Sequence, residues 1–199
     1  MPKLDQNLRL ERCPHCNVAN PNLFKQHMLE TYDSSMALKR IWFIYTCGTC
    51  GGVVTAWSIK GQSDEVMGIF PSPKEVDNEI PERPRAYLKQ AIESIHAPAG
   101  AVMLAATAVD SMLKLKGYNE GSLYSRIEKA AQEHVITPEM SLWAHEVRLD
   151  ANDQRHADET SSLPDQNDAK RVIDFSMALA EFMFVLPNRI QRGLNKKES

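Results

Sequence analysis

Cys13-Pro14-His15-Cys16 and Cys47-Gly48-Thr49-Cys50 are the two stretches that decide the fold of the N-terminal part of the chain. Both have the form Cys-x-x-Cys, and together they contain every cysteine of the protein. Two residues between the cysteines let one tight turn direct both sulfur atoms at a single ion, and zinc prefers thiolate ligands in a tetrahedron. We therefore predict that Cys13, Cys16, Cys47 and Cys50 bind one structural Zn²⁺ ion.

Other uses of these cysteines fit the pattern less well. A cytosolic chain rarely keeps disulfides, and the duplicated pattern argues against a single redox dithiol. Catalytic zinc sites leave one coordination position open, whereas four cysteines fill all of them. His15 lies between two of the cysteines, and we expect it to be exposed rather than to bind the metal.

The residues between and after the cysteine pairs predict strands. Residues 23–32 and 38–46 form a hairpin in this interpretation, because Ile41–Tyr45 is aromatic and β-branched and Asp33-Ser34-Ser35 is a turn sequence. Residues 53–57 follow as the strand that leaves the second pair, where Gly48 and Gly51-Gly52 give the turn its conformational freedom.

The N-terminal part is thus predicted to be a small β zinc ribbon over residues 1–75. Residues 61–85 contain Pro71, Pro73, Pro81 and Pro84 among polar residues, which indicates an extended connector reaching to about residue 84. A short further strand is expected at 67–70. The first domain and the rest of the chain are therefore expected to be separate.

After Pro84 the sequence becomes helical. Apolar residues recur at helical spacing in five segments, at about 84–96, 98–117, 122–135, 138–155 and 165–186. The second segment is apolar nearly all round, which predicts the central buried helix. Pro187 is expected to end the last helix. Short connections between amphipathic helices predict an antiparallel bundle, so the predicted fold class is α+β.

The composition excludes several classes of protein. Hydrophobic residues make up 43% of the 199-residue chain and charged residues 25%, as in globular rather than disordered proteins. The apolar runs are too short to span a bilayer, and the N-terminus has no apolar signal core. We therefore expect a soluble, cytoplasmic protein without a membrane partner. Because the net charge is −3, any nucleic-acid contact would require a local patch.

A polar stripe is the main feature of the predicted helix at 138–155. It consists of His145, Arg148, Asn152 and His156, whose spacing places them along one side of a helix. Arg binds phosphate through paired charge-assisted hydrogen bonds, and Asn and His are further donors. The same stripe is also typical of a solvated helix face or of a polar network within a bundle, so both interpretations stay open.

Asp110 interrupts the buried side of the predicted helix at 98–117. A carboxylate in that position requires a cation, because an unpaired buried charge is costly. Arg148 is the first candidate for its partner.

Sequence pieces spread over most of the chain carry a resemblance to one family. They are the two cysteine pairs, the connector to Ile80-Pro81, Leu104–Asp110, Leu123 with Ile127, Val147–Asn152, His156 and Leu186-Pro187. In these pieces the chain resembles bacterial and phage proteins that carry the domain of unknown function 4145. That family usually has Arg-x-x-Gly-Asn-x-x-x-His in the fourth helix, where Ala151 replaces the glycine. In the second helix it often has Arg followed by Glu, where this chain has Ala106 and Asp110.

The helical part of that family is similar to HEPN domains, many of which are dimeric, metal-independent ribonucleases of toxins, CRISPR effectors and phage defence. The resemblance implies a five-helix HEPN-like bundle over residues 85–199 and a homodimer formed through it. The HEPN motif is an Arg, often followed directly by Asn, and then a His. Asn152 and His156 match its second half, and Ala151 occupies the position of its Arg. The motif has four to six residues between Arg and His, whereas seven separate Arg148 from His156.

Three functions follow as hypotheses. We expect a non-catalytic module, in which the zinc ribbon and the HEPN-like domain bind RNA or a partner protein in phage defence or a toxin–antitoxin setting. The first alternative is an HEPN-type ribonuclease, in which Arg148 orients the phosphate, Asn152 positions the substrate and His156 is the general base. The second alternative is a nucleotide-binding protein that uses the same stripe, with His145 and Asp110 as further ligand-binding candidates.

Overall fold

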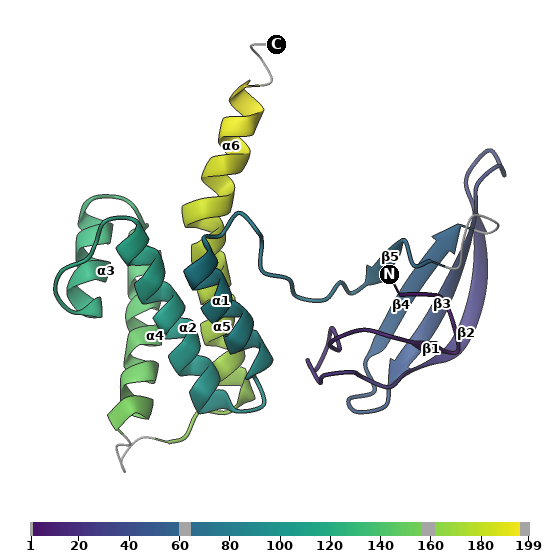
Figure 1. Ribbon diagram of the computed structural model, residues 1–199, viewed down its shortest axis with the longest axis horizontal. Helices are drawn as coiled ribbons and strands as arrows, with labels where there is room; N and C mark the ends of the chain where they lie inside the picture. Colours follow the sequence, from purple (N-terminus) through teal and green to yellow (C-terminus); the bar gives the residue numbers. More distant parts are fainter. Residues whose placement is uncertain (1, 60–64, 157–161, 196–199) are drawn as a thin grey trace. The chain divides into compact units, whose positions relative to one another are not determined.

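The computed structural model describes residues 2–59, 65–156 and 162–195, and the side chains of all of these except 154–156. The chain divides into two compact units, Met1–Lys74 and Glu75–Ser199 (Figure 1). The first unit contains an antiparallel sheet and the second contains helices. The α+β class predicted from the sequence is therefore confirmed.

The first unit is built on one five-stranded sheet in which every strand pairs antiparallel with its neighbour in sequence. The strands are β1 (Asn7–Leu8), β2 (Leu23–Tyr32), β3 (Lys39–Cys47), β4 (Val53–Ile59) and β5 (Gly68–Phe70). The predicted hairpin is β2 and β3, whose register pairs Leu23 with Cys47 and Tyr32 with Lys39. The two-residue strand β1 is too short to leave a pattern in the sequence.

Within the described residues, the core of the first unit lies on one face of this sheet. Leu23, Tyr45, Val54 and Ala56 are fully buried there, because residues of the N-terminal segment such as Leu8 pack over them. Tyr45 donates its hydroxyl to the carbonyl oxygen of Asp5, 3.0 Å away, which ties that segment to the sheet. The core is small, so the unit has little apolar burial to hold it together.

The second unit is a helical bundle. Its helices are α1 (Glu82–Glu93), α2 (Pro98–Leu115), α3 (Leu123–Gln132), α4 (Pro138–His156), α5 (Gln166–Ala180) and α6 (Leu186–Asn195), with the π-helical turn η1 (Glu181–Val185) between α5 and α6. Side-chain caps mark three of the starts, and at α4 the Thr137 hydroxyl accepts a hydrogen bond from the Met140 N–H at 3.2 Å. Ser122 accepts a hydrogen bond from the Ser125 N–H at α3, and Asp165 forms a capping box with Asp168 at α5.

Helix α2 is the central helix, as its sequence predicts. It packs against α1, α3, α4 and α5, and Ala101, Val102, Ala105 and Ala108 are fully buried. By length and composition α2 is apolar enough to cross a membrane, but half of that stretch is buried inside the bundle. Its apolar surface therefore forms the core of the second unit.

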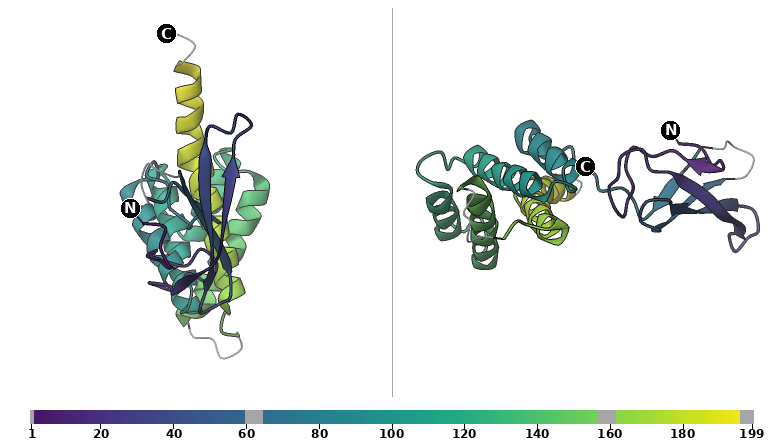
Figure 2. Two further views of the ribbon diagram at one scale, coloured as in Figure 1. Left: turned by 90° about the vertical axis from the view of Figure 1, so that its right-hand side faces the viewer. Right: turned by 90° about the horizontal axis from the view of Figure 1, so that it is seen from below.

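The prediction that Pro187 ends the last helix is wrong. The helix continues through η1 into α6 and reaches Asn195. The left view of Figure 2 shows this long helix, in yellow, from the side. In the π turn the Leu186 N–H donates to the carbonyl oxygen of Glu181 instead of the usual residue four positions back. Because this wider turn comes directly before Pro187, the helix accommodates the proline ring and its missing N–H.

Candidate functional site

The two cysteine pairs form two turns with the same backbone geometry. In the first, the Asn17 N–H donates to the Cys13 carbonyl oxygen at 2.9 Å, and in the second the Gly51 N–H donates to that of Cys47 at 2.8 Å. Asn17 and Gly51 each follow the second cysteine of their pair, and both have a positive φ, of 58° and 71°. Asn and Gly are the residues that adopt this conformation at least cost, so each pair is followed by the residue its turn requires.

These turns bring the four cysteines together. Their sulfur atoms all lie within 4.8 Å of one another, and the sulfurs of Cys13 and Cys50 are 4.0 Å apart. A tetrahedral zinc site with Zn–S bonds of about 2.3 Å places its sulfurs about 3.8 Å apart, so the cluster has the dimensions of a metal site. All four cysteines are free thiols.

The environment of the sulfurs differs from one to the next. Burial raises the pKa of the Cys13 thiol, and burial raises that of Cys16 to about 12. Burial also acts on Cys47, but hydrogen bonds from the backbone of Cys50 and Thr49 outweigh it and lower its pKa to about 7. A bound cation would favour the thiolate form at every position, because metal binding to cysteine releases protons.

His15 is not part of the cluster. Its side chain is exposed, as predicted, and its Nε2 donates to the carbonyl oxygen of Val53 at 2.7 Å. The imidazole ring lies so close to Gly52 that a Cβ at that position would come within 2.5 Å of it. His15 therefore connects the first turn to the start of β4 and leaves the four sulfurs as the candidate ligands.

The predicted polar stripe of α4 meets α3. The ring of His145 stacks on Tyr124 with 4.6 Å between centroids, and its Nε2 lies 2.7 Å from Oε1 of Glu128. The guanidinium of Arg148 lies 5.4 Å from the centroid of the same Tyr124 ring. The structure thus brings His145 and Arg148 together around Tyr124, and we call these three residues with Glu128 the α3–α4 cluster.

Of the other two members of the stripe, Asn152 does not join this cluster. Asn152 is exposed on α4, and the side chain of His156 lies outside the described residues. Within the described part of the chain no carboxylate pairs with Arg148. Among the same residues, the buried Nε of Arg148 and the buried Nδ1 of His145 have no hydrogen-bond partner. The α3–α4 cluster therefore offers one stacked cation and one imidazole beside each other.

Asp110 belongs to a different group of charges, and the prediction that Arg148 is its partner is wrong. Its carboxylate lies 2.7 Å from Nη2 of Arg126 and 2.6 Å from Nζ of Lys114. Arg126 lies on the side of α3 opposite Tyr124 and Glu128, and it reaches Asp110 on α2. The counter-charge of Asp110 therefore comes from α3 and not from α4. Asp110 is therefore a packing residue between α2 and α3 in this structure.

Replacing Asp110 by Ala should destabilise the bundle. The Arg126 side chain is only 11% exposed and would lose its counter-charge, so we expect a loss of about 2 kcal/mol in the free energy of unfolding. Lys114→Ala removes the more exposed partner and should cost well under 1 kcal/mol. Chemical denaturation followed by circular dichroism measures both, and equal losses would contradict this account.

Ala151 faces the core. It is 4% exposed and shares a buried face of α4 with Ala144 and Val147. That face packs within the bundle, where α4 contacts α2 and α5. Small residues here let α4 approach the alanine-rich α2 closely, which gives a packing reason for Ala or Gly at this position.

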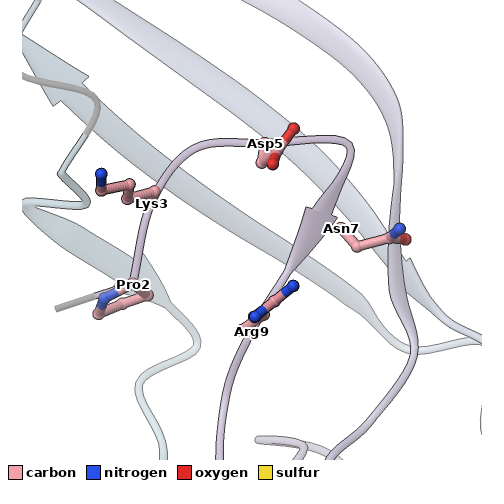
Figure 3. A pocket seen from close by; sticks show the side chains of 5 residues that line it. All are labelled: Pro2, Lys3, Asp5, Asn7 and Arg9. Carbon is pink, nitrogen blue, oxygen red and sulfur yellow. The ribbon is translucent and has the colours of Figure 1, made fainter.

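A surface depression lies beside the N-terminal segment of the first unit. It has a volume of about 400 Å³ and is lined by Pro2, Lys3, Asp5, Asn7 and Arg9 in the N-terminal segment. Figure 3 shows that these side chains point in different directions and do not converge on one point. This arrangement does not resemble a preorganised binding site.

Sequence reasoning missed Tyr124, Arg126 and Glu128. Tyr124 and Glu128 are four residues apart on the predicted helix at 122–135, so their common side could have been inferred. That this side meets His145 and Arg148, while Arg126 meets Asp110, depends on how three helices pack.

Comparison with known proteins gives one result. The family model described as Domain of unknown function (DUF4145) matches residues 89–197, from within α1 to the C-terminal tail, and leaves the cysteine turns outside its range. No curated protein and no solved structure matches the chain. Because the model covers more than half of the sequence, the chain belongs to the family of proteins with the domain of unknown function 4145.

Proposed function

We propose that the protein is a non-catalytic binding module, made of a zinc ribbon and a degenerate HEPN-like helical domain, that contacts RNA or a partner protein. A phage-defence or toxin–antitoxin setting is part of this proposal and rests on the family resemblance alone. The zinc ribbon is supported by the four clustered thiols, whose donor set is the one zinc prefers.

The burial of Ala151 carries the non-catalytic part of the proposal. In an HEPN ribonuclease the residue at this position is the arginine that contacts the scissile phosphate. Here the side chain points into the bundle beside Ala144 and Val147, so the position faces apolar neighbours rather than a substrate. Arg148, the nearest substitute, is stacked on Tyr124 instead.

One observation favours a second candidate, an HEPN-type ribonuclease or nucleotide-binding site centred on Arg148. Within the described residues this guanidinium has no carboxylate partner and lies next to His145. A phosphate could bind there through Arg148, with Asn152 exposed on the same helix. A homodimer would place two such sites in one assembly.

An RNA cleavage assay separates the two candidates. The purified zinc-loaded protein is incubated with labelled total RNA, with and without a chelator. We expect intact RNA under both conditions. Cleavage that persists with chelator and disappears in both Arg148→Ala and His156→Ala would overturn the proposal in favour of the ribonuclease.

The matched control for Arg148→Ala is Arg171→Ala. Arg171 is a more exposed arginine of the same unit, and it pairs with Asp150 of α4 at 2.9 Å. If cleavage falls equally in both variants, the activity is a contaminant or a general effect of charge and not a property of the stripe.

A further inference from the structure

One face of the sheet in the first unit has no layer over it among the described residues of that unit. Strand register places the side chains of this face in cross-strand rows: Leu29, Trp42 and Trp57 form one row, and His27, Ile44, Thr55 and Phe70 form the next. The N-terminal segment packs on the opposite face, against Tyr45 and Val54. We call the first of these faces the aromatic face.

Three aromatic rings lie together at the centre of the aromatic face. The centroids of Trp42 and Trp57 are 5.7 Å apart, and those of Trp42 and Phe70 are 6.3 Å apart. Phe70 is 55% exposed and Leu29 43%, so the cluster is open at both edges. Rings in this arrangement form a continuous apolar surface several residues wide.

Gly68 explains how Trp57 lies on the sheet. A Cβ at Gly68 would come within 2.3 Å of Nε1 of Trp57, so the indole lies directly against the backbone of β5. Trp42 donates its own Nε1–H to the hydroxyl of Thr31 at 2.9 Å. Because the indole N–H of Trp42 already donates to Thr31, the part of this ring that remains available to a ligand is its π surface.

Among the described residues, Arg40 is the charged residue of the aromatic face. Its guanidinium lies 5.3 Å from the Trp57 ring, and Arg40 belongs to the row next to that of Leu29, Trp42 and Trp57. The rows from Phe24, Thr46 and Val53 to Thr31, Arg40 and Ile59 contain no aspartate or glutamate among the described residues. The opposite face differs, because Lys39 there is paired with Glu30 at 2.5 Å.

We propose that the aromatic face binds single-stranded nucleic acid, with bases stacked on Trp42, Trp57 and Phe70 and a backbone phosphate at Arg40. This inference rests on the proposed binding function and names its ligand. Stacked aromatic rings beside a cation, on an open sheet, match the requirements of unpaired bases and their phosphates. A second copy of the chain fits less well, because its aromatic face would offer Arg40 no aspartate or glutamate among the described residues.

The test is a binding titration with the full-length, zinc-loaded protein. Fluorescently labelled oligo-U, oligo-A and oligo-dT serve as probes, and a duplex of matched sequence serves as the comparison; binding is followed by anisotropy. We expect the single strands to bind more tightly than the duplex and to bind more weakly as salt rises. Comparison of the RNA probes with oligo-dT shows whether the 2′-hydroxyl of the sugar affects the affinity.

Two matched pairs of variants locate the site. Phe70→Leu should lower affinity about tenfold, because base stacking on an aromatic ring is lost, whereas Tyr32→Leu removes a comparably exposed ring from the opposite face and should change it less than twofold. Arg40→Ala should weaken binding about fivefold or more, and Lys39→Ala, next to it on the opposite face, should not. Circular dichroism and zinc content verify that each variant is folded.

The outcomes decide the proposal. Loss of affinity confined to Phe70→Leu and Arg40→Ala supports it. Absence of binding to every oligonucleotide, equal binding to the duplex, or equal losses in both members of a pair overturns it, and leaves the helical unit of the chain or another protein as the occupant of the face. Cleavage of a probe would contradict the non-catalytic function instead, so the two failures are distinguishable.

Discussion

Removing the metal should unfold the first unit and leave the second intact. The buried core of the first unit consists of a few residues on one side of the sheet, and two of these are the cysteines Cys13 and Cys47. A domain of this size rarely folds on apolar burial alone. Binding of a structural zinc ion supplies about 10 kcal/mol or more to such folds, so its loss exceeds any stability the sheet has by itself.

Hydrogen exchange measured by mass spectrometry resolves the two units in one experiment. After treatment with a strong chelator, peptides from β2, β3 and β4 should lose their protection, whereas peptides from α2 and α5 should keep theirs. Cys16→Ser should behave like the chelated protein without any treatment. Elemental analysis of the untreated protein should give one zinc per chain.

His15→Ala is the matched control for the cysteine variant. His15 lies in the same turn but donates to Val53 and contributes no ligand, so this variant should retain its zinc and most of the protection of β4. Protection of β3 that survives chelation would show that the sheet is held by its own packing, and would contradict the role assigned to the metal.

The cysteine turns show how much the sequence can predict when a structure depends on local spacing. Both pairs and the strands on either side of Cys47 were predicted close to their observed positions, because the cysteine spacing and the β-branched residues each act over a few residues. The role of Asn17 was not predicted. It becomes visible only when the two turns are compared and Asn17 takes the conformation that Gly51 has in the other turn.

The α3–α4 cluster depends on contacts between helices, which the local sequence pattern does not predict. The sequence predicted that His145 and Arg148 share a side of a helix, which is a matter of helical period. Because a buried carboxylate requires a cation, the sequence predicts a basic partner for Asp110. The sequence alone does not distinguish Arg148 from the other arginines of the unit. The choice of Arg126 depends on the packing of α3 against α2. The continuation of the last helix beyond Pro187 depends similarly on the π turn, whose sequence has no recognisable signal.

Ala151→Arg should unfold the helical unit rather than create a ribonuclease. Under the proposed HEPN-like interpretation, the substitution supplies the motif arginine directly before Asn152 and upstream of His156. In the structure it places a long, charged side chain on the buried face of α4, which packs within the bundle where α4 contacts α2 and α5. Overpacking and the burial of an unpaired charge together should cost at least about 4 kcal/mol, or about 15 °C in Tm, if the variant folds at all.

Asn152→Arg is the control for that substitution. It introduces the same side chain at the next residue of α4, where Asn152 is exposed, so its Tm should stay within about 2 °C of the wild type. Thermal unfolding followed by circular dichroism compares the two variants under identical conditions.

If Ala151→Arg melted like the wild type, its side chain would have reached solvent, and the buried face of α4 would not be what excludes the motif arginine. If that variant then cleaved RNA, the fold would be an intact ribonuclease scaffold that lacks one side chain, and the packing argument for a binding role would fail.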